Sequence, residues 1–523
     1  MDDHVSTTAK TRGGIGDTLA GLRILFLPKN SRTRYFQSLL GTARREHGWH
    51  IVVVGPERHA SVWHNIAENF AAMPDFTQLQ TWENDRGACE ELDTFISSCE
   101  QASGTSAARI ILAGERDIGR GFSRPIYHWF QTKMVRMVLA DNTEPSRILR
   151  RMFAFARKTL QAAKPDLLLA GEWADPVCFT FYLAARQMGI RCAVNRPSKV
   201  WSGRSYWSAE PMMYNHAARA LVAQKRSKKS PISARARERI TEFRAAPATL
   251  GYVKQNWEAS DRRGFLAYHL DLARLFWMEM RHYLKRRSGP PPKPALQLAF
   301  DHYRRAWLKW RQAGLFRRFD EAALRDMRYL FIALHKDPEQ GLNYQASYWS
   351  YQMYTVGLLS SCLPYGYKLL VREHRANAGR RPRRFYKNMT MLPGVNLVDG
   401  FDGQFKYITN ADLIVTDNGS TGWEGLLLGR PVITLADTFY DSPELTHRIR
   451  DPEQLATEVV KILERPSACD ASAYDQALGW LLDAEWETTA PLDAGDDVKT
   501  RALLADVYMA RESSPPSVPN LPA

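Results

Sequence analysis

The chain has 523 residues, of which 45% are apolar and 24% are charged. This composition excludes a disordered protein, and the length is enough for at least two substantial hydrophobic cores. Lysine and arginine outnumber aspartate and glutamate by 71 to 56, which gives a formal net charge of +15. Such an excess favours an anionic partner, for example a nucleotide, an acidic glycan or a lipid surface, without choosing among them.

The cysteines and the apolar runs bear on where the protein works. The six cysteines are spread along the chain without a C-x-x-C pair, which argues against a disulfide framework and a structural zinc site. Segment 1–21 is polar, and no apolar run approaches the roughly 20 residues that span a bilayer. We therefore expect a cytoplasmic protein, with peripheral contact to the inner face of the plasma membrane left open.

The first part of the chain alternates short apolar strands with helices. Strands are predicted at 22–28, 50–54, 109–113, 166–170 and 191–194. Alternation of this kind indicates a mostly parallel sheet that is covered by helices on both faces. We expect residues 1–21 to be a flexible tail and residues 22–224 to be an N-terminal Rossmann-like domain that binds the acceptor.

Between residues 225 and 322 the strand pattern disappears, and basic and aromatic residues interleave. Two or three helices are predicted here, divided by the proline-rich stretch 289–294. The more ordinary interpretation is a helical connector whose aromatic residues pack on the flanking domains. The alternative is a basic aromatic face at 265–318 that rests on an anionic membrane.

A second alternating pattern covers residues 323–467. Its strands are predicted at 329–334, 367–371, 395–398, 411–416 and 431–435, with a long helix at 345–363. Residues 468–511 are expected to form helices that strap the domains together, and residues 512–523 a disordered tail. The predicted fold class is α/β, with two Rossmann-like parallel-sheet domains facing a cleft and a helical insertion between them. Ligands bind such sheets at the carboxyl ends of the strands.

The most informative stretch is 417–425, which leaves a predicted strand and opens a helix. Small residues there let a ligand approach the backbone, and the N–H groups at a helix start suit a phosphate. Ser420 and Thr421 add hydroxyl donors, and Glu424 is placed to accept from ribose or sugar hydroxyls. The same residues also fit a plain helix start, with Ser420 or Thr421 as N-cap and Glu424 completing a capping box.

Three further strand ends of the second domain carry polar groups. Arg372, His374 and Arg375 follow one strand and suit the phosphate leaving group of a glycosyl transfer, on which negative charge grows. A lone histidine is more often structural than catalytic, but its place beside two arginines at a strand end makes the two interpretations equally good. The stretches 335–339 and 437–441 follow two other strands and are expected to line the same cleft.

Candidate residues of the first domain also follow strands. Glu172 and Asp175 come after strand 166–170, where a carboxylate can deprotonate an acceptor hydroxyl or act as a nucleophile. Asp175 fits a plain N-cap of the next helix as well. Three residues beyond the next strand are predicted to bind an acidic acceptor: Arg196, Lys199 and Arg204.

These motifs resemble those of the capsule and surface-polysaccharide biosynthesis glycosyltransferases of GT-B architecture, the broad group that includes the bacterial Kdo transferases. The resemblance runs in order through 335–339, 372–374, 385–386, 392–395, 418–424, 429–432 and 439–440. Such enzymes bind the nucleotide sugar mainly on the C-terminal domain. The resemblance and the strand ends together predict these donor-binding residues: His335, Glu339, Arg372, Arg375, Asn418, Gly419, Ser420, Thr421, Gly422, Glu424 and Tyr440.

Two departures from the family pattern concern the donor loops. The family usually has His-Pro where this chain has His374 followed by Arg375, and Arg375 adds a charge where proline would fix the loop. Lys336 and Asp337 replace the more typical Tyr-Gln. The first domain carries no family motif, so a catalytic role for Glu172 rests on position only.

The predicted function is that of a metal-independent glycosyltransferase. It moves a sugar from a nucleotide-sugar donor to a surface polysaccharide or lipid-linked glycan. The resemblance suggests a CMP-linked acidic sugar such as Kdo as donor, while a UDP- or GDP-sugar stays open. The predicted catalytic residues are Glu172, Asp175 and His374. No D-x-D motif follows a strand of the donor domain, so neither a metal nor another cofactor is expected.

Two alternatives stay open from the sequence. One is a nucleotide-sugar 2-epimerase on the same fold, with Glu172 or His374 as acid or base. The other is a non-catalytic subunit that binds or assembles polysaccharide, which the altered position after His374 favours. Nucleic-acid binding is not expected, because the basic residues are dispersed and no recognition motif occurs.

Overall fold

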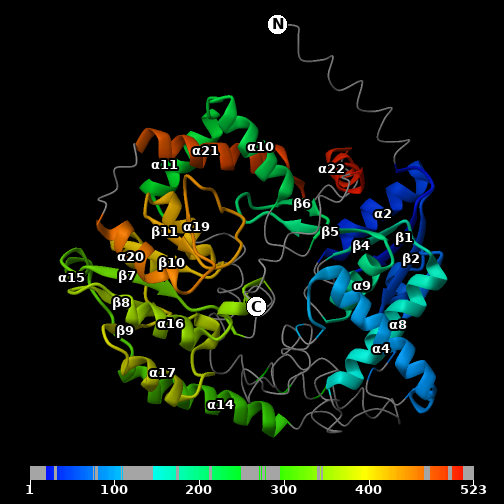
Figure 1. Ribbon diagram of the computed structural model, residues 1–523, viewed down its shortest axis with the longest axis horizontal. Coiled ribbons are helices and arrows are strands. Elements are labelled where there is room, and N and C mark those ends of the chain that lie inside the picture. The colour runs from blue at the N-terminus through cyan, green and yellow to red at the C-terminus, as the bar shows by residue number, and fades with distance from the viewer. Residues whose placement is uncertain are drawn as a thin grey trace, which may run out of the picture.

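The computed structural model describes most of the chain, and the following account concerns only these residues: 19–28, 32–74, 80–107, 145–171, 176–210, 215–248, 295–337, 345–464, 471–492 and 498–509, with single positions 76, 109, 270, 273, 277 and 342. They form two α/β domains, each built around its own sheet, which lie side by side in Figure 1.

The first sheet has the strand order β13-β6-β5-β4-β1-β2-β3. Five of its strands form a parallel block: β1 (Arg23–Leu27), β2 (His50–Gly55), β3 (Asn69–Ala72), β4 (Leu167–Ala170) and β5 (Arg191–Pro197). The two others pair antiparallel at one edge: β6 (Arg204–Ser208) and β13 (Ala490–Pro491). Each parallel strand therefore ends at the same edge of the sheet.

Helices cover both faces of this sheet, because alternate side chains of the buried central strands point to opposite sides. Leu25 and Leu168 belong to a core with α4 (Arg86–Ser103), α8 (Pro145–Ala163) and α9 (Pro176–Gln187). Ile24 and Leu167 belong to a second core with α2 (Thr33–His47) and α22 (Val498–Met509).

The second sheet has the strand order β12-β11-β10-β7-β8-β9, and all its pairs are parallel. Its strands are β7 (Tyr329–Ala333), β8 (Lys368–Arg372), β9 (Val395–Val398), β10 (Leu413–Thr416), β11 (Val432–Thr434) and β12 (His447–Arg448). One face packs on α16 (Gln352–Ser361), α17 (Arg383–Thr390) and α20 (Gln454–Glu464). The other packs on α15 (Glu321–Arg325), α18 (Gln404–Asn410) and α19 (Ser420–Leu427).

The chain crosses between the two domains more than once. After the first sheet, α10 (His216–Ser227) and α11 (Ala234–Ala245) pack against α21 (Ala471–Glu487), and these helices lie together at the top of Figure 1. Residues of α11 and α21 share a core with the second sheet. The last helix, α22, then packs on β5 and β6 of the first sheet. Two Rossmann-like domains that exchange helices in this way form a GT-B architecture.

One long helix and several short ones complete the described elements. They are α14 (Ala295–Gln312), α3 (Ala60–Trp63), and the 3₁₀ turns η2 (Glu57–His59), η3 (Thr81–Asn84), η4 (Ala313–Leu315), η6 (Ser347–Trp349) and η7 (Arg375–Asn377). No helix in the described ranges combines the length and the apolar character needed to cross a bilayer.

The structure confirms the predicted α/β fold class and most of the predicted strands. Strand 109–113 and the break at 289–294 fall outside the described residues, except for position 109. The sequence pattern did not predict β3, β6, β12 or β13. The single helix expected at 345–363 is wrong in detail, because η6 and α16 divide the segment. The predicted domain boundaries stay predictions.

Candidate functional site

The candidate site lies at the carboxyl edge of the second sheet. Strands β10, β7 and β8 are consecutive neighbours, so the residues that follow them come together. His335 follows β7 and Asp417 follows β10, and the His335 Nε2 atom lies 3.8 Å from the Asp417 Oδ2 atom. His374 follows β8, and the Asn377 side chain just beyond it donates to the His335 carbonyl oxygen at 3.2 Å.

Gly419 joins β10 to helix α19 and leaves no room for a side chain. A Cβ atom at this position would lie 3.0 Å from the Thr416 Oγ1 atom and 3.3 Å from the His335 ring. The Gly419 N–H group donates to Thr416 Oγ1 at 2.9 Å. The loop is therefore held against the Thr416 and His335 side chains, and only glycine fits at this position without moving them.

The start of α19 differs from the capped helix that was one interpretation of the sequence. Gly419 is the N-cap residue, and no side chain caps the helix, so the capping box of Ser420 or Thr421 with Glu424 does not form. Ser420 is half-buried and Thr421 is buried in the first turn. The first N–H groups of a helix without a side-chain cap suit an anion, as does the positive end of its dipole.

Glu424 is buried beneath this loop rather than exposed at its rim. Gln404 connects it to β8, because its amide donates to Glu424 Oε2 at 3.0 Å and accepts from Arg372 Nη1 at 3.3 Å. Burial raises the pKa of Glu424 to about 8, and the Arg372 charge opposes that shift only in part. Burial therefore favours the protonated form of Glu424.

Arg372 is also an internal residue. Its Nη2 atom donates to the carbonyl oxygens of Gly400 at 2.6 Å and Asp402 at 3.1 Å. Burial lowers the pKa of Arg372 to about 10. The guanidinium thus ties the loop after β9 to the end of β8, and it supports the site from within.

His374 is presented by a short, firmly held turn. Its Nδ1 atom accepts from the Ala376 N–H group at 3.1 Å, which leaves Nε2 as the ring nitrogen that can donate. The backbone is fixed by buried Glu373, which accepts from the His374 N–H group at 2.7 Å and from the Tyr386 hydroxyl at 2.6 Å. Arg381 completes this support with an ion pair to Glu373 at 3.3 Å.

Arg375 adds a half-buried positive charge to the same edge. Its Nε atom donates to the Gly400 carbonyl oxygen at 3.0 Å, and its guanidinium lies 5.5 Å from the centre of the Phe401 ring. The Arg375 charge is therefore oriented by the loop after β9. A fixed cation beside the His374 donor makes this edge attractive to a phosphate.

Asp417 is the second buried carboxyl group of the site. Burial raises its pKa to about 7, and its Oδ1 atom accepts no hydrogen bond from the described residues. The His335 Nε2 atom lies 3.8 Å from the other carboxylate oxygen of Asp417, so an imidazole and a buried carboxyl group face each other at this strand edge. Asn418, which follows it, is buried as well.

Tyr440 supports the loop from the side of β11. Its hydroxyl donates to the Gly419 carbonyl oxygen at 2.6 Å, and it fills the space over Gly422, where an added Cβ atom would lie 2.3 Å from that hydroxyl. Tyr440 is fully buried. Its position suits holding the loop rather than contacting a donor directly.

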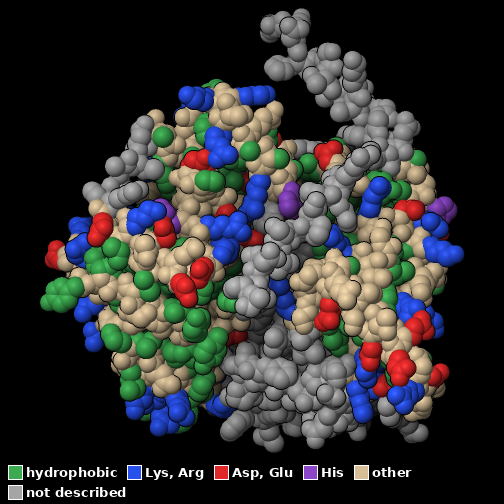
Figure 2. All heavy atoms as spheres, in the orientation of Figure 1, with side chains coloured by type: hydrophobic (Ala, Val, Ile, Leu, Met, Phe, Trp, Pro, Cys, Tyr) green, Lys and Arg blue, Asp and Glu red, His purple; other side chains and the backbone are tan. Residues whose placement is uncertain are grey.

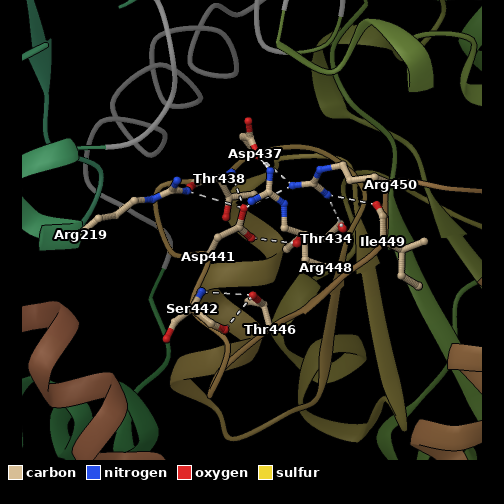
Figure 3. A network of polar contacts seen from close by, with 10 residues as sticks. All are labelled: Arg219, Thr434, Asp437, Thr438, Asp441, Ser442, Thr446, Arg448, Ile449 and Arg450. Carbon is tan, nitrogen blue, oxygen red and sulfur yellow. Dashed lines mark hydrogen bonds and ion pairs between the residues drawn. The ribbon is translucent and has the colours of Figure 1, made fainter. Parts of the chain in front are cut away.

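Residues next to Tyr440 belong to the polar network in Figure 3. Arg219 of α10 donates to the Thr438 carbonyl oxygen at 2.9 Å and lies 3.8 Å from Asp441. Asp441 also accepts from the Thr434 hydroxyl at 2.8 Å and lies 3.6 Å from Arg450. The segment after β11 is thus fixed to the helix that connects the domains.

The acceptor residues predicted in the first domain separate into two groups. Arg196 is buried beside Tyr206, its partner on β6, and the Lys199 ammonium lies 5.8 Å from the centre of the Phe439 ring. Loops from the carboxyl ends of β5 and β11 therefore meet. Arg204 instead donates to Thr489 Oγ1 at 2.8 Å and stacks on Trp486, so it is committed to the C-terminal helices.

The structure adds Arg32, which is not among the residues predicted from the sequence. It follows β1 and donates to the carbonyl oxygens of Gly171 and Asn195, which lie at the ends of β4 and β5. Burial lowers the pKa of Arg32 to about 10. The sequence signal that could have indicated Arg32 is its place between the first predicted strand and the helix that follows it. Glu172, Asp175 and Glu339 lie outside the described residues.

Among the described residues, no three histidine, cysteine, aspartate or glutamate side chains gather as metal ligands would.

No family model matches the chain, and no curated protein matches it.

Solved structures give distant matches. The UDP-GlcNAc 2-epimerase from Neisseria meningitidis bound to UDP-GlcNAc is 11% identical with a TM-score of 0.23, over 89% of this chain and 98% of that chain. The Methanocaldococcus jannaschii UDP-GlcNAc 2-epimerase is 12% identical with a TM-score of 0.22, over 85% and 93%. The β-Kdo 2,7 transferase KpsC from Thermosulfurimonas dismutans is 10% identical with a TM-score of 0.28, over 62% and 79%. Such low values carry no argument, and the fold rests on the two sheets themselves.

Proposed function

We propose that the chain is a glycosyltransferase that binds a nucleotide-sugar donor at the carboxyl edge of the second sheet. The observation that carries this proposal is the grouping of anion-binding donors on adjacent strand ends. They are the uncapped start of α19, the Nε2–H group of His374 and the fixed charge of Arg375. Each donates to or attracts a phosphate, and none needs a metal to do so.

These donors suit a transfer step, because negative charge grows on the phosphate as the glycosidic bond to the donor breaks. Groups that are already oriented stabilise that charge without reorganising. His374 is positioned by Glu373, and Gly419 by Thr416 and Tyr440, so both sides of the phosphate site are preorganised. We propose that His374 acts on the leaving phosphate and that catalysis is metal-independent.

The acceptor side of the proposal is the first domain. Lys199 is suited to an acidic acceptor. Arg196 and Arg204 are not included, because Arg196 is buried beside Tyr206 and Arg204 binds the C-terminal helices. Glu172 or Asp175 remains the proposed base for the acceptor hydroxyl. A surface polysaccharide or lipid-linked glycan as acceptor, and a CMP-linked acidic sugar as donor, rest on the family resemblance.

A nucleotide-sugar 2-epimerase is the second candidate, and the His335–Asp417 pair favours it. Epimerisation needs groups that give and take a proton near neutral pH, and burial raises the pKa of Asp417 to about 7. Incubation of a sugar nucleotide without an acceptor separates the two activities. An epimerase changes the sugar, whereas a transferase leaves it intact or releases it slowly to water.

The nucleotide site is tested by thermal shifts with CMP, UDP, GDP, ADP and their sugar conjugates, since a ligand of the native state raises the melting temperature. Two variants isolate His374. His374→Asn keeps a side-chain acceptor for the Ala376 N–H group, whereas His374→Ala removes it. His64→Ala, an exposed histidine of the first domain, is the control.

We expect one nucleotide to shift the wild-type protein and the His64→Ala variant equally. Both His374 variants should lose most of that shift and transfer activity, while His374→Asn melts like the wild type without ligand. A wild-type shift and wild-type turnover from His374→Asn would remove the donor-site assignment. A flat panel for the wild type would favour the non-catalytic polysaccharide-binding subunit.

A further inference from the structure

Helix α14 exposes two tryptophans on its outer side. Trp307 and Trp310 are 49% and 72% exposed. The Arg311 guanidinium lies 4.9 Å from the centre of the Trp307 ring, so an arginine and aromatic rings share this face. Large aromatic side chains are usually buried in a soluble protein unless a surface needs them.

The inner side of α14 fixes this orientation. Arg305 donates to the Ala378 carbonyl oxygen at 3.0 Å, and buried Gln312 donates to the Arg381 carbonyl oxygen at 2.7 Å. The Lys309 ammonium lies 3.7 Å from the centre of the Phe401 ring. The helix is therefore held against the loop that follows His374, and the exposure of its tryptophans is a consequence of that packing.

Two neighbouring helices extend the same surface. Helix α17 contacts both α14 and α16, and all three lie in the lower left of Figure 1. Exposed basic residues of α17 are Arg383, Arg384 and Lys387, and Met391 beyond it is 75% exposed. The segment at the start of α16 exposes Tyr348, Tyr351 and Tyr354. In Figure 2 apolar side chains gather over this region, with lysine and arginine along its lower rim.

The charges of these segments have one sign. Residues 341–398 contain eight lysines and arginines and a single acidic residue, Glu373, which is 2% exposed. Residues 302–319 contain six arginines and lysines and no acidic residue. Neither segment therefore has an exposed carboxylate of its own, although Arg318 pairs with Asp399, which follows 341–398.

We propose that this surface, formed by Trp307, Trp310, Arg311, Arg383, Arg384, Lys387, Met391, Tyr348, Tyr351 and Tyr354 and here named the docking face, rests on an anionic lipid bilayer. Tryptophan and tyrosine prefer the level of the lipid headgroups, where one end of the ring is wet, and lysine and arginine are attracted by anionic lipids. Charge complementarity thus favours acidic phospholipid over a neutral surface.

The docking face differs from the membrane surface expected from the sequence, which was limited to 265–318. Helix α14 lies within that range and also forms part of the docking face. Helices α16 and α17 lie later in the chain, and the fold brings them next to α14. The proposal goes beyond the proposed function and does not depend on it, because lipid binding needs no nucleotide. If both hold, the loop after His374 lies on the inner side of the helix that meets the lipid.

Flotation of the whole protein with vesicles tests the proposal. Phosphatidylcholine vesicles are compared with vesicles that also contain phosphatidylglycerol, at low and at high salt. Arg383→Gln with Arg384→Gln removes two charges of the docking face, and Trp307→Ser with Trp310→Ser removes its tryptophans. Lys228→Gln with Arg237→Gln makes the same charge change on exposed residues near α11, at the opposite end of the molecule in Figure 1.

We expect flotation only with the anionic vesicles, and less of it in high salt because screening weakens the attraction. The arginine pair should lower the partition coefficient about 30-fold, which corresponds to about 1 kcal/mol for each charge near the surface. The tryptophan pair should also weaken binding, and the control pair should bind like the wild type.

Three outcomes would overturn the proposal: no flotation with anionic vesicles, equal binding to neutral vesicles, or equal loss in the control pair. Binding to an acidic polysaccharide but not to vesicles would assign the face to a glycan instead. Thermal melts of each variant with and without nucleotide show whether the fold and the donor site are intact. A failure of lipid binding is thereby distinguished from a failure of the proposed function.

Discussion

Alanine substitutions at Gly379 and Gly429 test how tightly α14 is packed against the loop after His374. Both have φ +71°, so alanine at either position pays the same left-handed backbone strain, about 1 to 2 kcal/mol. They differ in surroundings. A Cβ atom at Gly379 would lie 2.3 Å from the Arg305 carbonyl oxygen, whereas one at Gly429 would have nothing within 4 Å.

An ordinary contact between carbon and oxygen is about 3.3 Å, so Gly379→Ala must move the loop and α14 apart by about 1 Å. That movement lengthens the hydrogen bonds from Arg305 to Ala378 and from buried Gln312 to Arg381. Each is worth about 1 kcal/mol, and a buried group left unsatisfied costs about 1 to 3 kcal/mol. We therefore expect Gly379→Ala to be about 2 to 4 kcal/mol less stable than Gly429→Ala.

Urea unfolding of both variants, followed by circular dichroism, measures this difference. The same preparations should show that Gly379→Ala weakens nucleotide binding, because the loop begins at His374, while Gly429→Ala does not. Equal stability of the two variants would refute the reasoning, since it would mean that α14 is not held against the loop.

Three further predictions concern residues that hold the loop at Gly419 and the segment after β11. Burial raises the pKa of Glu424 from 4.5 to about 8, so between these values the native state binds more protons than the unfolded chain. The free energy of unfolding should therefore fall as pH rises from about 5 to about 8. Glu424→Gln should flatten that slope by up to about 1.4 kcal/mol per pH unit, as measured by urea titrations at several pH values. Glu321→Gln, at an exposed position, should leave the slope unchanged. Tyr440→Phe removes the hydroxyl bound to the Gly419 carbonyl oxygen and should cost about 1 to 3 kcal/mol, with weaker nucleotide binding by calorimetry. Arg219→Ala should lower the free energy of unfolding by about 1 to 2 kcal/mol, which a thermal melt shows as a lower melting temperature. An unchanged melting temperature would show that the Thr438 contact is not stabilising.

The central strands could be predicted because their physical signal is strong. Parallel strands buried on both faces are short apolar runs, as in Leu167–Ala170 and Leu413–Thr416. The missed strands lack that signal. Strand β6 carries Arg204 at its start, and β12 and β13 are two residues long, so pairing with a neighbour decides their conformation rather than their own composition.

The candidate site could be predicted as a set of strand ends but not as a set of exposed side chains. Parallel strands of one sheet end at one edge, so His335, His374 and Asp417 were expected near one another. Which side chains turn inward depends on tertiary partners that no local pattern reveals. Arg372 donates to carbonyl oxygens after β9 and so points inward. The Gly419 N–H group donates to the Thr416 hydroxyl, a contact that the local sequence does not predict.

Three consecutive residues after β11 contact three different parts of the molecule. The Thr438 carbonyl oxygen accepts from Arg219 of the connecting helix α10, the Phe439 ring lies 5.8 Å from Lys199 of the first domain, and Tyr440 holds Gly419. A segment this short cannot shift at one residue without moving the next, because its peptide units are rigid. The backbone at Gly419 and the position of the first domain are thus linked through side chains that are mostly buried. Coupling of this kind is reciprocal. If a ligand that moves Gly419 stabilises or destabilises the contact between the domains, forming that contact changes the free energy of ligand binding by the same amount.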